Sequence, residues 1–226
     1  MDKKGLYMVT GFCAILAGIL SVVGYICYLI GVQSIKMPMP QNVDDVIKVF
    51  KAPFVQAAAN INALSLIFLF PGIVGIMLFL YQKAKGLSVV GFTFGVLGFL
   101  LFFLEMFIES GIGRIAWGQE QMIAPEAVKT SVGIFYLLDE FIMFPGLFLT
   151  AVFYLLFGFA FKRFDGISKT IGNLFLLTVL FFILTFIFFA VKSNLIASIC
   201  ILIQVILVAI ALVMAGSMLR KFEPTD

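Results

Sequence analysis

Six long runs of apolar residues make up most of this chain and leave little polar sequence between them. A helix needs about 20 predominantly apolar residues to cross the hydrocarbon part of a bilayer. The sequence predicts six such helices, over residues 8–32, 59–82, 87–109, 132–161, 169–191 and 194–218. Only 12% of the 226 residues are charged, whereas soluble domains have about 25%. The predicted fold is therefore an all-α, polytopic membrane helical bundle, with a single transmembrane domain over residues 1–226.

The basic residues suggest how this bundle is oriented. If the N-terminus is inside, nine Lys and Arg side chains lie on the cytoplasmic side: Lys3, Lys4, Lys83, Lys85, Lys162, Arg163, Lys169, Arg220 and Lys221. Six lie on the other side: Lys36, Lys48, Lys51, Arg114, Lys129 and Lys192. Short cytoplasmic loops carry an excess of basic residues. We therefore expect a multi-pass protein of the cell's inner membrane with both termini in the cytoplasm.

The longest early loop, residues 33–58, carries an amphipathic pattern. Apolar side chains recur at helical spacing after Asn42, a residue type that caps helix N-termini, while Lys48 and Lys51 fall on the other side. We expect a short helix in the outer membrane interface. The sequence leaves open whether this helix is a lid over an outward-facing cavity or only a connector.

Two predicted membrane helices contain the same Phe-Pro-Gly triplet, at Pro71-Gly72 and Pro145-Gly146. Proline removes a backbone hydrogen bond from a helix, so these four residues are predicted helix breaks. A basic turn and a further apolar run follow each triplet. This order suggests a parallel hairpin repeat, in which the second and third helices correspond to the fourth and fifth.

Polar side chains gather in the predicted outer halves of several helices. Glu105 and Asp139 lie on faces that are small near the cytoplasm and polar near the exterior, and Tyr136, Asn62 and Tyr25 lie at similar depth. The sequence predicts that these five residues line an outward-facing polar cavity. If Glu105 and Asp139 face each other, they could share a proton or hold a cation. Intramembrane acids are rare, but both could also serve only structure.

Two further acids, Glu109 and Glu140, are interpreted as markers of the headgroup boundary. The chain contains no histidine, and Cys13, Cys27 and Cys200 are isolated. Neither a metal-ligand spacing nor an enzyme motif is present. The sequence therefore predicts no catalytic residue, no metal site and no cofactor, and it does not favour an enzyme. It also lacks the basic stripe with interleaved aromatic residues that is typical of nucleic-acid binding.

The layout resembles that of a family of uncharacterised six-helix bacterial membrane proteins. The shared features are six helices, a longer loop after the first helix, the element Ala59-Asn60-Ile61 at the start of the second, and a similar length. The resemblance implies a membrane fold and transfers no site residue.

Two functions are compatible with these patterns. The first is the binding or transport of a small cationic or amphipathic molecule through the outward-facing cavity. The second is an accessory or structural subunit that docks a partner helix on the small-residue face formed by Gly91 and Gly95. The expected partners are the lipid bilayer, a small-molecule ligand, and either another membrane protein or a second copy of this chain.

Overall fold

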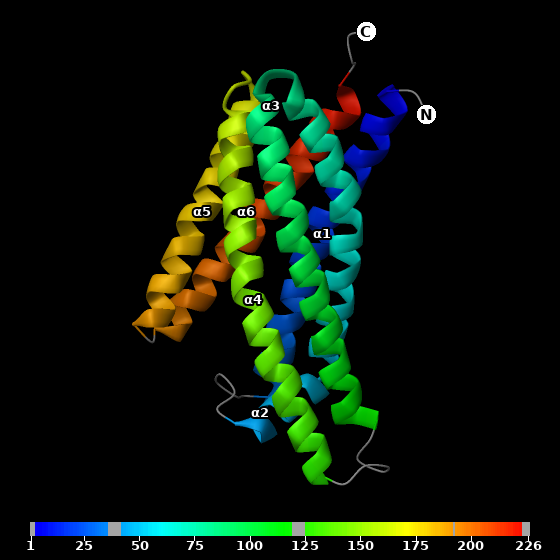
Figure 1. Cartoon of the computed structure of the whole chain (residues 1–226), viewed down its shortest axis with the longest axis vertical. Helices are drawn as coiled ribbons and strands as arrows, with labels where there is room; N and C mark the ends of the chain where they lie inside the picture. The colour runs from blue at the N-terminus through cyan, green and yellow to red at the C-terminus, as the bar shows by residue number, and fades with distance from the viewer. Residues whose placement is uncertain (1–2, 36–41, 119–124, 192, 223–226) are drawn as a thin grey trace.

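The computed structural model describes residues 3–35, 42–118, 125–191 and 193–222, and every regular element in these ranges is an α-helix. The helices are α1 (Lys3–Ile35), α2 (Val43–Lys51), α3 (Pro53–Gly118), α4 (Pro125–Phe161), α5 (Ile167–Ala190) and α6 (Asn194–Lys221). Figure 1 shows an elongated bundle. The start of α1, the end of α6 and the α4–α5 turn lie at one end, and α2 lies toward the other.

Helix α3 is 66 residues long and folds back on itself at Ala84, where φ is −134° and ψ is 44°. These angles lie outside the helical range. The bend falls in the polar segment Lys83-Ala84-Lys85-Gly86, between two apolar runs. The first arm (53–83) and the second arm (85–118) lie side by side. Gly113 of the second arm is so close to Gln56 of the first that a Cβ added to Gly113 would meet the Gln56 side chain. Figure 1 shows the reversal of direction at the end where the chain termini lie.

Five helices, α1, α3, α4, α5 and α6, are long and apolar enough to cross a membrane. The protein is thus a helical bundle with the character of a multi-pass membrane protein. The predicted segments 59–82 and 87–109 both lie within α3, one on each side of the bend. The other four predicted segments correspond to α1, α4, α5 and α6 in turn.

The two Phe-Pro-Gly triplets lie inside helices that are not interrupted. Helical structure continues on both sides of Pro71 and Pro145, which corrects the predicted breaks. Both following glycines lie at close helix contacts: Gly72 lies against Ala14 of α1, and Gly146 lies against α3. The triplets therefore mark helix crossings, since glycine lets two helices approach closely. The hairpin repeat stays a prediction from the sequence.

An aromatic core joins α3, α4 and α5. Phe153, Phe157 and Phe175 are almost fully buried. The ring of Phe153 lies 4.4 Å from that of Phe157 and 5.3 Å from that of Phe99, measured between centroids. Aromatic pairs at such distances contribute beyond the apolar area that they bury. These contacts fix α4 between its two neighbours.

Helix α2 begins at the cap that the sequence predicts. The Asn42 side chain accepts a hydrogen bond of 2.9 Å from the backbone N–H of Asp45. The apolar face of α2 contributes three buried side chains, Val46, Val49 and Phe50, to a second apolar cluster. We call this the end cluster; its other buried members are Ala52, Val55, Ile108, Ile112, Val128 and Val132. The end cluster binds α2 to both α3 and α4.

Candidate functional site

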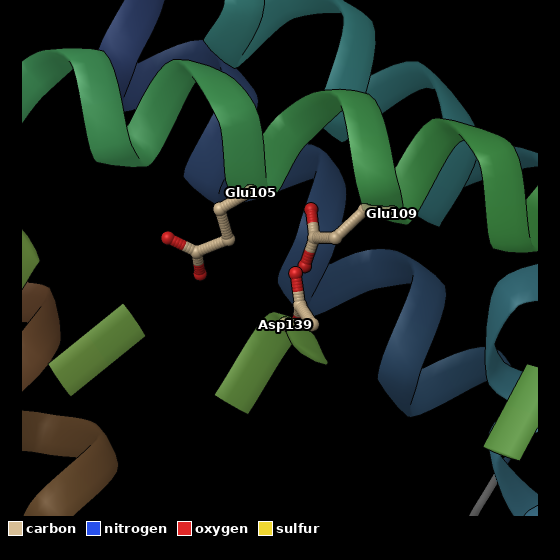
Figure 2. A group of neighbouring side chains, drawn as sticks. All are labelled: Glu105, Glu109 and Asp139. Carbon is tan, nitrogen blue, oxygen red and sulfur yellow. The ribbon is translucent and has the colours of Figure 1, made fainter. Parts of the chain in front are cut away.

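Three carboxyl groups meet between the second arm of α3 and helix α4. They belong to Glu105 and Glu109 of α3 and to Asp139 of α4, and one oxygen from each lies within 4.8 Å of the others. The two glutamates share a face because they are four residues apart, about one helical turn. Figure 2 shows the carboxyl groups of Glu109 and Asp139 facing each other, with Glu105 beside them on the same helix as Glu109. We call this group the carboxylate cluster.

Two members of the carboxylate cluster are deeply buried and incompletely paired. Glu105 is 8% exposed and Asp139 is 7% exposed, whereas Glu109 lies partly open at the edge. The Glu105 Oε2 and Asp139 Oδ1 atoms have no hydrogen-bond donor among the residues that the structure describes. A buried polar atom without a partner costs about 1–3 kcal/mol, and more if it is charged. Such atoms in folded proteins often indicate strain, a catalytic role, or a bound water or ion.

The negative charges of the cluster are not balanced by basic side chains in the described part of the chain. The two ion pairs seen there, Lys48–Asp45 and Lys129–Asp44, both involve α2 and not the cluster. Two ionised carboxylates with oxygens within 4.8 Å of each other repel by at least about 3.5 kcal/mol at an effective dielectric constant of about 20. Three carboxyl groups at this spacing therefore need either a bound cation or protons that leave fewer of them ionised.

The donor atoms of the cluster determine which cation they suit. All of them are carboxylate oxygens, the ligands that hard cations such as Ca²⁺ and Mg²⁺ prefer. Mg²⁺ gives up its bound water reluctantly and usually keeps several waters, whereas Ca²⁺ accepts about 6–8 oxygen ligands in a flexible geometry. A group of three protein carboxyl groups therefore suits Ca²⁺ better than Mg²⁺.

The end cluster adjoins the carboxylate cluster along α3. Ile108 and Ile112, on either side of Glu109 in the sequence, are buried against α2 and α4. Helix α2 is also held to the start of α4 by the ion pair between Lys129 and Asp44, with a nitrogen–oxygen distance of 2.8 Å. Glu109 is the half-buried member of the carboxylate cluster.

Of the five predicted site residues, the structure places two in the carboxylate cluster and a third, Tyr136, close enough to Asp139 to interact with its charge. Glu105 and Asp139 meet as expected. Tyr136 packs against the end cluster. Asn62 lies against Gly24 of α1. The Tyr25 hydroxyl donates a hydrogen bond of 3.4 Å to the backbone carbonyl of Ser198 on α6. The last three therefore have packing partners of their own.

The sequence interpretation missed Glu109, which it assigned to the headgroup boundary. The signal was present, because Glu109 follows Glu105 by four residues on a face shared with Gly98 and Phe102. Glu140, which the sequence assigned to the same boundary, is exposed and is not a member of the carboxylate cluster. Asp139, its neighbour in the sequence, points the other way, into the bundle.

Two hollows in the described structure lie away from the carboxylate cluster. One, of about 380 Å³, lies between α1 and α6, and another, of about 240 Å³, lies between the arms of α3. The second is lined partly by Asn60, Ser110 and Arg114. None of the three clustered acids lines either hollow. An outward-facing cavity at Glu105 and Asp139 stays a prediction.

Comparison with known proteins adds no relative from which a site could be carried over. The resemblance to a six-helix bacterial family rests on the layout of the chain alone. A search of protein-family models, of curated proteins and of solved structures found no match to this chain.

Proposed function

We propose that this protein binds a small hard cation in the membrane, with Glu105, Glu109 and Asp139 as its ligands. The observation that carries the proposal is the pair of buried, unpartnered oxygens of Glu105 and Asp139 within a group of three carboxyl groups. A bound cation would neutralise the repulsion among these groups and occupy both oxygens. The three protein carboxyl groups favour Ca²⁺ over Mg²⁺, because Mg²⁺ exchanges its bound water for protein ligands reluctantly.

Cation binding should stabilise the folded protein. Purified protein in detergent is titrated with CaCl₂, MgCl₂ or NaCl, and the free energy of unfolding is measured at each concentration. A ligand at 100 times its Kd stabilises the folded state by about 2.7 kcal/mol. We expect Ca²⁺ to give this stabilisation at lower concentration than Mg²⁺. Glu105→Gln and Asp139→Asn should each lose most of it.

The matched control for these variants is Glu140→Gln. Glu140 is next to Asp139 in the sequence but exposed, so the substitution removes the same charge without removing a ligand. It should keep Ca²⁺ binding with only a small loss of affinity, because the Glu140 charge acts on Asp139 without ligating the ion. Equilibrium dialysis with radioactive Ca²⁺ measures binding independently of stability. Unchanged binding in both Glu105→Gln and Asp139→Asn would contradict the assignment of the site.

We further propose that the chain crosses the membrane six times, with each arm of α3 as one crossing. A straight helix of 66 residues would be about 99 Å long, about three times the hydrocarbon thickness of a bilayer. The bend at Ala84 divides α3 into two arms of suitable length. Lys83, Lys85, Lys162 and Arg163 lie at turns at the same end as both chain termini (Figure 1). This gathering of basic residues supports a cytoplasmic location for that end, at the inner membrane.

Labelling of single cysteines tests this topology. Gly86→Cys places a thiol at the bend, where an added Cβ meets no other atom within 4 Å. Glu126→Cys places a thiol at the exposed start of α4. In intact cells, a membrane-impermeant maleimide should label the cysteine at 126 and not the cysteine at 86, and inverted vesicles should reverse the result. Labelling of both positions from one side would overturn the six crossings.

The cation site could serve transport as well as binding. Charged residues within membrane segments commonly belong to ion or substrate pathways. Proteoliposomes loaded with a Ca²⁺-sensitive dye test this extension. We expect uptake of Ca²⁺ that Asp139→Asn abolishes and Glu140→Gln preserves. Tight binding without uptake would restrict the function to cation binding.

The alternative function, an accessory subunit docked through Gly91 and Gly95, needs a different surface. A Cβ on Gly91 would lie 2.8 Å from Cδ1 of Phe157, and one on Gly95 would lie 2.6 Å from Cδ2 of Phe153. The small-residue face of α3 is thus filled by α4 of the same chain. These contacts favour cation binding over this mode of docking.

A further inference from the structure

An apolar groove of about 380 Å³ runs along the contact between α1 and α6. Its walls are aliphatic side chains and glycine, including Gly18, Val22 and Val23 of α1 and Ala209, Val213 and Met214 of α6. The two helices come close at its base, because a Cβ added to Gly18 would lie 2.9 Å from the Ala209 carbonyl oxygen. The larger side chains on either side form the walls of the groove. We call this feature the α1–α6 groove.

Two basic residues lie on the same stripe of α6 as the α1–α6 groove. Arg220 follows Val213 by seven residues, and Lys221 follows Met214 by seven, so each pair shares a helix face. Seven residues correspond to about 10 Å along the helix. Arg220 and Lys221 are both exposed. The stem of Arg220 lies against Gly11 of α1, since a Cβ on Gly11 would be 2.9 Å from the Arg220 Cγ. Positive charge thus lies beyond the end of the groove that is nearer the C-terminal end of α6, and the Arg220 stem also contacts α1.

The distance from the deep end of the groove to Arg220 fits one leaflet of a bilayer. The hydrocarbon part is about 30 Å thick, so each leaflet contributes about 15 Å. Ala209, at the deep end, is eleven residues or about 16 Å from Arg220. A lipid whose phosphate lay at the level of Arg220 would therefore extend an acyl chain along the groove without crossing the bilayer midplane.

We propose that the α1–α6 groove binds an acyl chain of an anionic phospholipid whose phosphate is held by Arg220 and Lys221. The apolar walls match the chain, and the basic pair matches the charge of the headgroup. Basic residues beside grooves between membrane helices are a known basis of anionic lipid recognition. This inference depends on the protein residing in a membrane and is independent of the carboxylate cluster.

The test compares the lipids retained by the purified full-length protein. Native mass spectrometry in detergent is recorded with added phosphatidylglycerol or phosphatidylcholine that carry the same acyl chains. We expect phosphatidylglycerol to bind more tightly. The double variant Arg220→Gln/Lys221→Gln should weaken phosphatidylglycerol binding. The expected loss is about fivefold if one of the two basic residues contacts the headgroup and about 30-fold if both do. Phosphatidylcholine binding should change little.

The control for charge is Lys162→Gln/Arg163→Gln. It removes two positive charges from the α4–α5 turn, which lies at the same end of the bundle but away from the groove (Figure 1). It should retain phosphatidylglycerol normally. A third variant, Val22→Phe, fills the groove from α1 and should weaken the binding of both lipids. Circular dichroism checks that each variant remains helical.

Three results would overturn the proposal. The first is unchanged phosphatidylglycerol binding in Arg220→Gln/Lys221→Gln. The second is unchanged binding in a folded Val22→Phe variant, which would mean that the acyl chain lies elsewhere. The third is a dimer mass that Val22→Phe converts to a monomer mass, which would show that a second copy of the chain occupies the groove.

Discussion

Replacement of Glu109 with lysine is expected to abolish Ca²⁺ binding and to stabilise the cation-free protein. Glu109 is half-buried, whereas Glu105 and Asp139 are buried, so a lysine is accommodated more easily at this position than at the other two. Its ammonium group would stand in for the bound cation between Glu105 and Asp139. If every carboxyl group is ionised, the three side chains together carry a charge of −3 before the substitution and −1 after it.

The size of this effect follows from the buried, unpartnered oxygens. A hydrogen bond to a charged group contributes about 1.5–3 kcal/mol, so the free energy of unfolding without Ca²⁺ should rise by about that amount. Affinity for Ca²⁺ should fall at least about 100-fold, because a positive charge would replace a ligand within a few ångströms of the ion. Unfolding with and without Ca²⁺, together with equilibrium dialysis, measures both effects.

Two variants separate the proposed cause from a general effect of charge. Glu109→Gln removes the negative charge without supplying a positive one, so it should weaken binding and stabilise the protein less than lysine does. Glu126→Lys makes the same charge change at the exposed start of α4, and it should leave Ca²⁺ binding intact. Normal Ca²⁺ binding by Glu109→Lys would remove Glu109 from the site.

Replacement of Phe153 with alanine is expected to lower the free energy of unfolding by about 3–5 kcal/mol, the usual cost of truncating a fully buried Phe. Phe153 is 1% exposed and contacts the rings of Phe99, Phe157 and Phe175, so its loss leaves a cavity where α3, α4 and α5 meet. Reversible unfolding in mixed micelles measures the change. Phe148→Ala is the matched control, because Phe148 is on the same helix but 65% exposed.

The same contact makes a prediction about Gly95. An added methyl group there would lie 2.6 Å from Cδ2 of Phe153, so Gly95→Ala should cost about 1–3 kcal/mol by overpacking. In a Phe153→Leu background, which removes the ring, the cost should fall. A double-mutant cycle isolates this coupling. Additive effects of the two changes would mean that the helices do not meet at these residues.

The sequence was sufficient to predict the helices and the cap of α2, because both depend on local patterns. Long apolar runs identify candidate membrane helices, and Asn42 has a side chain suited to the start of a helix. The bend in α3 was predictable for the same reason, since Lys83 and Lys85 interrupt the apolar sequence. In each case the determining residues are neighbours in the chain.

The partners of each helix face were harder to predict. In a membrane bundle the faces toward lipid and toward protein are both apolar, so the hydrophobic pattern does not fix the rotation of a helix. Asn62 and Tyr25 are polar at the expected depth, yet they contact α1 and α6 instead of the acids. Glu105 and Asp139 could be placed together because acids are rare within apolar helices. The location of Glu109 beside them depended on the pairing of α3 with α4.

The contact of Gly11 with Gly216 links the order of synthesis to the assembly of the bundle. A Cβ on either glycine would collide with the backbone carbonyl of the other, so α1 and α6 touch at their backbones. Helix α6 is made after α1, about 200 residues later, which takes about 10–40 s at 5–20 residues per second. During that time α1 can pack only against earlier partners such as Gly72 and Asn62 of α3. Closure of the bundle must therefore wait until the ribosome has finished α6.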